Sequence, residues 1–125
     1  MKQSTAILDG FEFVPAVDAP ALTLDKYYRL YINRSTRRLL GVSPYDRLAV
    51  AYRPDRSELA IVKSNAKLGG QLQAEALASV FAVDKRYYLH LRVMARLYAI
   101  KPAKFVYDRG ASDGTIFVFR RQDSP

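Results

Sequence analysis

The chain has 125 residues, of which half are hydrophobic and 26% are charged, and it contains only six Gly and six Pro. This length allows one domain around one core and excludes two large independent cores. The composition excludes a disordered, collagenous or low-complexity chain. There is no Cys and only one His, which excludes disulfide bonds, thiolate chemistry and sites built from several His ligands.

No apolar run approaches the ~20 residues that a membrane helix needs, and the start of the chain lacks the pattern of a signal peptide. We therefore expect a cytoplasmic protein that has no membrane association. The sequence also has no phosphate-binding Gly loop and no nucleophile with a base nearby, so we expect no enzymatic activity and no cofactor or metal.

The net charge is +8, and it is unevenly distributed along the chain. Residues 1–25 carry a net charge of −3, whereas residues 26–125 carry +11. Thirteen of the twenty basic residues are Arg, whose planar guanidinium group suits phosphates and base edges better than Lys does. The positive charge therefore belongs to the body of the fold.

The first 21 residues form an acidic leader, in which Phe11–Val14 could be an edge strand. After it, alternating apolar and polar residues predict a strand over Lys26–Asn33. A short helix should follow, capped by Ser35 or Asn33, with Leu39 and Leu40 on its apolar side and Gly41 at its end.

Two further strands are predicted over Arg47–Tyr52 and Glu58–Lys63, because Pro54 stands where a type I turn favours it. The first unit is thus a strand, a short helix and a hairpin. A connector over 65–80 contains Gly69-Gly70 and then a short amphipathic helix, which we interpret as a spacer.

A second copy of this unit is indicated by the similarity of residues 22–44 to residues 81–102. The alignment pairs Tyr27-Tyr28 with Tyr87-Tyr88, and Arg38 with Arg96. It predicts a strand over Tyr87–Val93, a helix over Met94–Tyr98 and strands over Lys104–Tyr107 and Thr115–Arg120. The domain would span 22–121, with repeats at 22–64 and 81–121 and a tail at 122–125.

The order of strand, Arg-rich short helix ending in Gly, Pro-containing turn and hairpin resembles the AbrB-like swapped-hairpin DNA-binding family. The resemblance rests on RLYINRSTRRLLGVSPYDRLAVAYRPDRSELAIVK, residues 29–63, and more faintly on 88–121. The family's usual Gly before the apolar part of the first strand is replaced here, by our alignment, with Arg29. The resemblance implies a mainly β fold, a swapped-hairpin β-barrel made from two repeats within one chain, and a role in transcription regulation.

One 40-residue unit is too small to hold a core by itself, so the two repeats should share one. We expect residues 1–64 alone to form no stable monomer. The expected core comprises Leu30, Ile32, Leu39, Val42, Leu48, Val50, Leu59 and Ile61 facing Leu91, Val93, Leu97, Ile100, Val106, Ile116 and Val118.

Basic residues gather in the predicted strand and helix of each copy. Such a stripe attracts phosphate through counterion release, and Arg can add contacts to base edges, so a nucleic acid is the expected partner. The resemblance implies that this nucleic acid is double-stranded DNA. The resemblance implies that Arg29, Arg34, Arg37 and Arg38 face the DNA. The full set of expected nucleic-acid-binding residues is Arg29, Arg34, Arg37, Arg38, Arg47, Arg86, Arg92 and Arg96.

Other interpretations of these residues remain open. The chain could instead be a protein-interaction module, antitoxin-like or an inhibitor, or a binder of single-stranded nucleic acid or RNA that stacks bases on its tyrosine pairs. A homodimer is also open. For the tyrosine pairs, packing in the core or an interface is favoured over stacking on bases. For Asp25 and Asp84, a role in a turn or an ion pair is favoured over chemistry. Arg38 could form an ion pair with Asp46. Arg120 and Arg121 lie outside the stripe, and replacing them should cause only a small, general electrostatic loss of DNA binding.

Overall fold

The computed structural model describes residues 6–13, 19–63 and 68–122. In chain order its elements are β1 (Ala21–Leu24), β2 (Arg29–Ile32), α2 (Arg34–Leu40), β3 (Arg47–Arg53), β4 (Glu58–Lys63), α3 (Gly70–Ala78), β5 (Val80–Ala82), β6 (Tyr88–His90), α4 (Arg92–Leu97), β7 (Ala103–Tyr107), the 3-10 helix η1 (Arg109–Ala111) and β8 (Ile116–Arg121). The fold is mainly β, as the sequence predicts.

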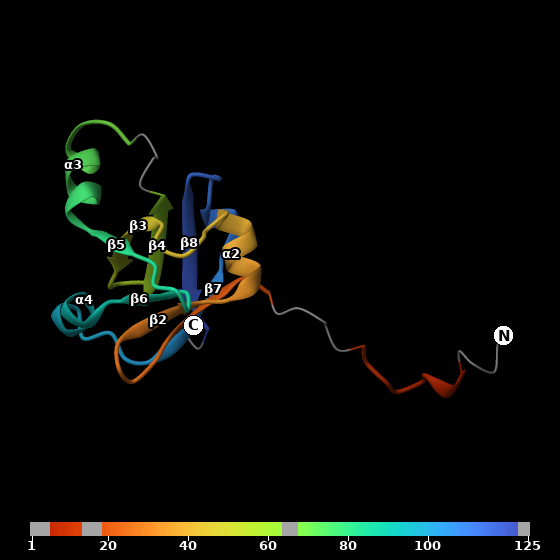
Figure 1. The fold of residues 1–125 in the computed structure, drawn as a ribbon. Coiled ribbons are helices and arrows are strands. Elements are labelled where there is room, and N and C mark those ends of the chain that lie inside the picture. The colour runs from red at the N-terminus through yellow and green to blue at the C-terminus, as the bar shows by residue number, and fades with distance from the viewer. Residues whose placement is uncertain (1–5, 14–18, 64–67, 123–125) are drawn as a thin grey trace.

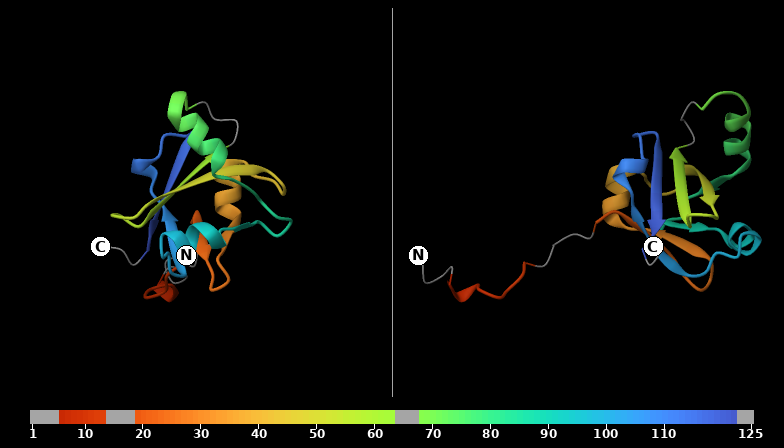
Figure 2. Two further views of the ribbon diagram at one scale, coloured as in Figure 1. Left: turned by 90° about the vertical axis from the view of Figure 1, so that its left-hand side faces the viewer. Right: turned by 180° about the vertical axis from the view of Figure 1, so that it is seen from behind.

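The strands form one antiparallel eight-stranded sheet in the order β5-β3-β4-β8-β7-β1-β2-β6 (Figure 1). The two edge strands, β5 and β6, follow one another in the chain and lie in contact. The sheet therefore curls into a nearly closed, barrel-like structure, with the helices outside it (Figure 2).

Most neighbouring strands in this sheet come from different halves of the chain. β1 pairs with β7, where Leu24 lies opposite Ala103, and β5 pairs reciprocally with β3, where Ala82 lies opposite Arg47. β2 pairs with β6 and β4 pairs with β8. Each half thus completes its sheet only with strands from the other.

The predicted elements of the first half are confirmed, with a shorter first strand. Asn33 caps α2 by accepting a hydrogen bond from the backbone N–H of Thr36, and Gly41 ends the helix in the left-handed conformation at φ 68°. β3 and β4 match their predicted ranges within one residue. The strand predicted from Lys26 begins only at Arg29, because the preceding residues form a turn around Asp25.

In the second half the prediction of a strand over Tyr87–Val93 is wrong beyond His90. β6 ends at His90 and α4 already begins at Arg92, so the strand is three residues long. β7 and β8 occupy the predicted positions within one residue, and Asp113 closes their connection by accepting hydrogen bonds from the N–H groups of Thr115 and Ile116.

The backbone also corrects the alignment of the two halves of the chain. Tyr28 and Tyr87 both have positive φ, 62° and 68°, and each donates a backbone hydrogen bond to the carbonyl of the preceding Asp25 or Asp84. Tyr28 therefore corresponds to Tyr87, one residue away from the pairing with Tyr88 that the sequence suggested. The left-handed position, which Gly favours, lies at Tyr28 and not at Arg29.

The predictions for the N-terminal segment and the connector are confirmed only in part. Residues 11–13 are not in a strand, so the edge strand is wrong there, and Val14 lies outside the described residues. The helix of the connector is confirmed as α3, although none of its residues is buried. β1 and β5, with four and three residues, are too short to give a periodic signal and were not predicted.

One core fills the barrel, and much of it was predicted. Leu30, Ile32, Val42, Leu48, Val50, Leu59, Ile61, Leu91 and Ile100 are buried as expected, and so is Leu40 on the apolar side of α2. The core also contains residues that were not expected: Leu22, Leu24, Val83, Leu89, Phe105, Phe117 and Phe119. The predictions for Leu39, Val93 and Leu97 are wrong, because these side chains are exposed. Val106, Ile116 and Val118 are only half-buried, since the inward positions of β7 and β8 are one residue away.

Among the described residues, no helix has both the length and the apolar character that crossing a membrane requires.

Candidate nucleic-acid interface

The paired strands β2 and β6 present a polar and aromatic outer face. Leu30 and Leu89, which lie opposite each other, are fully buried. Their neighbours along each strand therefore point outward: Arg29 lies opposite His90, and Tyr31 opposite Tyr88. The rings of Tyr31 and Tyr88 are in contact, with centroids 5.3 Å apart.

Arg29 is fixed in place at the centre of this face. Its Nε donates to Asp25 Oδ2 at 2.8 Å, and its guanidinium carbon lies 4.7 Å from the ring centroid of Tyr88 and 5.3 Å from that of Tyr27. Stacking on aromatic rings and bidentate donation are both typical of the guanidinium group. The group is thus oriented, while its side chain remains 38% exposed.

Asp25 shapes the turn from which Arg29 projects. Its Oδ1 accepts hydrogen bonds from the backbone N–H groups of Tyr27 and Arg29. Partial burial acts to raise the pKa of this carboxyl, but these hydrogen bonds and the guanidinium of Arg29 lower it below its ordinary value. The predicted turn and pairing role of Asp25 is confirmed.

Asp84 repeats this arrangement in the second half, with different partners. Its Oδ1 accepts from the N–H groups of Arg86 and Tyr88, and its Oδ2 lies 2.9 Å from Nε2 of His90. Burial again acts to raise the pKa of the carboxyl, and the hydrogen bonds lower it overall. The side chain of His90 is exposed.

The two short helices each place an arginine on a tyrosine of the other half. The guanidinium of Arg37 on α2 lies 3.9 Å from the ring centroid of Tyr87, and that of Arg96 on α4 lies 5.7 Å from Tyr28. Tyr28 and Tyr87 also pack against the core, which confirms the interpretation of these tyrosines as packing residues. The side chain of Arg37 is half-buried. It therefore packs on Tyr87 and also forms part of the surface.

The remaining arginines of the predicted set are exposed. They are Arg34 and Arg38 on α2, Arg86 in the β5–β6 turn, Arg92 on α4 and Arg47 at the start of β3. Within the described part of the chain, none of these five forms an ion pair. Arg47 does not belong to the β2–β6 region, since it lies opposite Ala82 of β5.

The alternative ion pair between Arg38 and Asp46 does not form. Asp46 Oδ2 instead accepts a hydrogen bond from the backbone N–H of Ser43 at 2.8 Å, which closes the turn before β3. The guanidinium of Arg38 is left exposed to solvent.

The segments 25–40 and 84–97 together contain nine basic residues and two acidic ones. Both acidic residues, Asp25 and Asp84, have their oxygens occupied by the turns and their partners. We call the seven arginines of these segments the arginine face: Arg29, Arg34, Arg37, Arg38, Arg86, Arg92 and Arg96. Sequence reasoning missed Tyr31 and His90 as outward members of this region, because their placement depends on how β2 and β6 pair.

Arg120 has a structural role that the sequence did not indicate. Its Nη2 lies 3.0 Å from Asp108 Oδ2 and 3.4 Å from Oε2 of Glu58, whose side chain is only 7% exposed. It therefore neutralises a buried carboxylate and belongs to the structure of the β4–β8 pair. Arg120 is unsuitable as a neutral control for binding.

In comparisons with known proteins, no family model, curated protein sequence or solved structure matches this chain.

Proposed function

We propose that this chain is a cytoplasmic DNA-binding protein, a transcriptional regulator that contacts duplex DNA through the arginine face. One observation carries the proposal: the β2–β6 pairing brings the two arginine-rich segments, far apart in sequence, side by side. We further propose that the protein is not an enzyme and needs no cofactor.

We also propose that the fold is a duplicated swapped-hairpin barrel of the AbrB-like kind. The reciprocal pairing of β1 with β7 and of β5 with β3 supports it, because each half exchanges its first strand with the other. The matching turns at Asp25 and Asp84, and the matching left-handed residues Tyr28 and Tyr87, support an origin of the two halves from one unit.

The arrangement of charge suits a polyanion better than a small ligand. Exposed arginines without ion pairs can each neutralise a phosphate and release a counterion. Arg29 and Arg37 are already oriented by the tyrosine rings beneath them, which reduces the entropy lost when such groups bind. Oriented guanidinium groups could also contact base edges.

The test is a fluorescence anisotropy titration with random-sequence duplex DNA at several salt concentrations. The affinity should fall steeply as salt rises. The variant Arg34→Ala/Arg38→Ala should reduce the slope of log affinity against log salt by about two, because each lost phosphate contact removes about one. Its thermal midpoint should be unchanged, since both side chains are exposed and unpaired.

The matched control is Arg56→Ala/Arg109→Ala, which removes the same charge from two exposed arginines in the β3–β4 turn and in η1. This control should change the slope by less than half as much. Equal losses in both variants would mean that net charge alone governs binding. No binding at low salt would overturn the proposal, and tighter binding to an oligo-dT strand than to duplex would replace duplex DNA with single-stranded nucleic acid.

A further inference from the structure

The turns that lead into β2 and β6 are related by a local two-fold symmetry of the backbone. In each turn the aspartate Oδ1 accepts hydrogen bonds from the N–H groups two and four residues later. The N–H of Ile32 donates to the carbonyl of Tyr87, and in the same way the N–H of Leu91 donates to that of Tyr28. The symmetry thus continues from the turns through both strands.

The side chains on the outer face of these strands do not follow this symmetry. The two-fold axis passes between the two buried leucines that lie opposite each other at the centre of the β2–β6 pair. It therefore makes Arg29 equivalent to Tyr88, and Tyr31 equivalent to His90. The outer face is symmetric in its backbone and asymmetric in its chemistry.

The two ends of the strand pair consequently present different groups. At one end, the Arg29 end, Arg29 lies opposite His90, and at the other, the Tyr88 end, Tyr88 lies opposite Tyr31. Asp25 binds the Nε of Arg29, so within the described part of the chain both Nη groups remain as donors for a partner. The equivalent residue at the other end, Tyr88, has no such planar fork.

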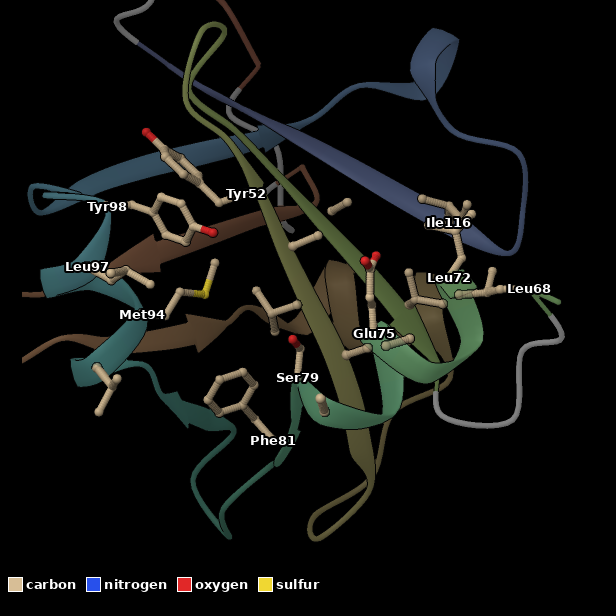
Figure 3. A pocket seen from close by; sticks show the side chains of 18 residues that line it. Tyr52, Leu68, Leu72, Glu75, Ser79, Phe81, Met94, Leu97, Tyr98 and Ile116 are labelled. Carbon is tan, nitrogen blue, oxygen red and sulfur yellow. The ribbon is translucent and has the colours of Figure 1, made fainter. Parts of the chain in front are cut away.

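The helices beside the two ends both carry arginines. α2 directly follows β2 and lies at the Tyr88 end, with three arginines, whereas α4 follows β6 and lies at the Arg29 end, with two. The apolar side chains of α4, among them Met94 and Leu97, line a groove of about 720 Å³ beside α3 (Figure 3). The arginines of the two helices can therefore hold phosphates on both sides of the strand pair.

A two-stranded β-ribbon fits the major groove of B-DNA, and a two-fold axis in the protein then coincides with a two-fold axis of the duplex. Each end of the β2–β6 pair would face one half of the site. A protein that presents the same groups to both halves recognises a palindrome. This chain presents a guanidinium group, which suits O6 and N7 of guanine, to one half alone.

On the basis of the DNA-binding function proposed above, we propose that this chain recognises a non-palindromic duplex site. One chain occupies the whole site. The half-site that faces the Arg29 end contains a guanine bound by Arg29, and the equivalent position of the other half-site has no preference for guanine. The phosphate contacts of the helices hold both halves but carry no sequence information.

The first test is selection of binding sites from a random duplex library by the full chain, followed by sequencing. The selected sites should share a non-palindromic consensus, and a stoichiometric titration of that duplex should saturate at one chain per duplex. Arg29→Lys keeps the charge but loses the planar fork, so it should reduce the preference for guanine at one position about fivefold or more. Arg109→Lys in η1, outside the arginine face, should leave every preference unchanged.

A second test maps the orientation of the protein on the selected duplex and needs no change at Arg29. Lys26 and Lys85 are equivalent by the two-fold symmetry and are both exposed, and the chain has no Cys of its own. An iron–EDTA reagent coupled to Lys26→Cys should therefore cut the DNA on the flank nearer the guanine that depends on Arg29. The same reagent on Lys85→Cys should cut on the opposite flank.

The possible failures separate this inference from the function on which it rests. A palindromic consensus, selected sites without a consensus, or equal cutting on both flanks by each conjugate would overturn the inference and leave duplex binding intact. An unchanged guanine preference in Arg29→Lys would overturn the assignment of that contact. A chain that binds no duplex at low salt would overturn the proposed function and this inference together.

Discussion

Thr36 offers the sharpest test of how α2 is attached to the barrel. Its side chain is fully buried, and its hydroxyl oxygen accepts a hydrogen bond from the backbone N–H of Ala21 at 2.8 Å. The same hydroxyl lies 2.7 Å from Asn33 Oδ1 and 3.0 Å from the carbonyl oxygen of Ala21, to either of which it can donate. Thr36→Val keeps the shape of the side chain and removes all of these bonds.

The cost follows from the groups that remain. The Ala21 N–H would retain only a 3.2 Å hydrogen bond to Asn33 Oδ1, and the Ala21 carbonyl only a 3.4 Å bond from the Asn33 N–H. Burying weakly satisfied backbone groups costs 1–3 kcal/mol, and we expect a loss of about 2 kcal/mol in the free energy of unfolding. For a chain of this length that corresponds to a fall in the thermal midpoint of roughly 8 °C.

The assay is denaturant and thermal unfolding, together with hydrogen exchange at the amide of Ala21, which should exchange faster in the variant. Thr23→Val is the control, because Thr23 lies on the same strand and is exposed. It should change the free energy of unfolding by less than about 0.5 kcal/mol, which is the usual range for substitutions of exposed residues. Equal stability of the two variants would refute the reasoning.

Arg120→Ala removes one of the cations beside the buried Glu58, so it should lower the free energy of unfolding by about 1–2 kcal/mol. Urea titrations measure this loss. The control Arg109→Ala should have almost no effect on the free energy of unfolding. Because the native pKa values of Asp25 and Asp84 are lower than in the unfolded chain, both carboxylates stabilise the fold above about pH 4 and lose this contribution as the pH falls further. Unfolding measured at pH 7, 5 and 3 should therefore show a decline at the acid end, which Asp25→Asn/Asp84→Asn should flatten; an unchanged pH profile in that variant would contradict the assignment.

Local signals in the sequence were sufficient for most of the first half. Asn33 and Gly41 mark the ends of α2 by hydrogen bonding and backbone freedom, which depend only on neighbouring residues. The Pro-containing turn similarly identifies β3 and β4. Such elements can be predicted without knowing what they pack against.

The second half depends on contacts that the sequence does not reveal. Phe105 and Phe119 face inward, rather than Val106 and Val118, because the registers of β7 and β8 are set by pairing with β1 and β4. Both sets of residues are apolar, so hydrophobic patterning cannot distinguish them. A shift of one residue reverses the face of every side chain on the strand.

The candidate site, like the fold, could be predicted only in part from the sequence. The arginines could be identified from charge and from the resemblance, and most of them are exposed. Their shared face, and the tyrosine rings under Arg29, Arg37 and Arg96, arise from pairing between the two halves, which no local pattern contains. Glu58, the buried partner of Arg120, is likewise far from it in sequence.

The pairing of strands between the two halves has a consequence for synthesis of the protein. Ala21 of β1 pairs with Val106, more than eighty residues later, and β4 pairs with β8 at the end of the chain. The first hairpin therefore leaves the ribosome with unsatisfied strand edges and an exposed apolar face, and it stays in that state until β7 and β8 have emerged. Pairings this distant in sequence slow folding, so the nascent chain passes through a long period in which it is vulnerable to aggregation and proteolysis.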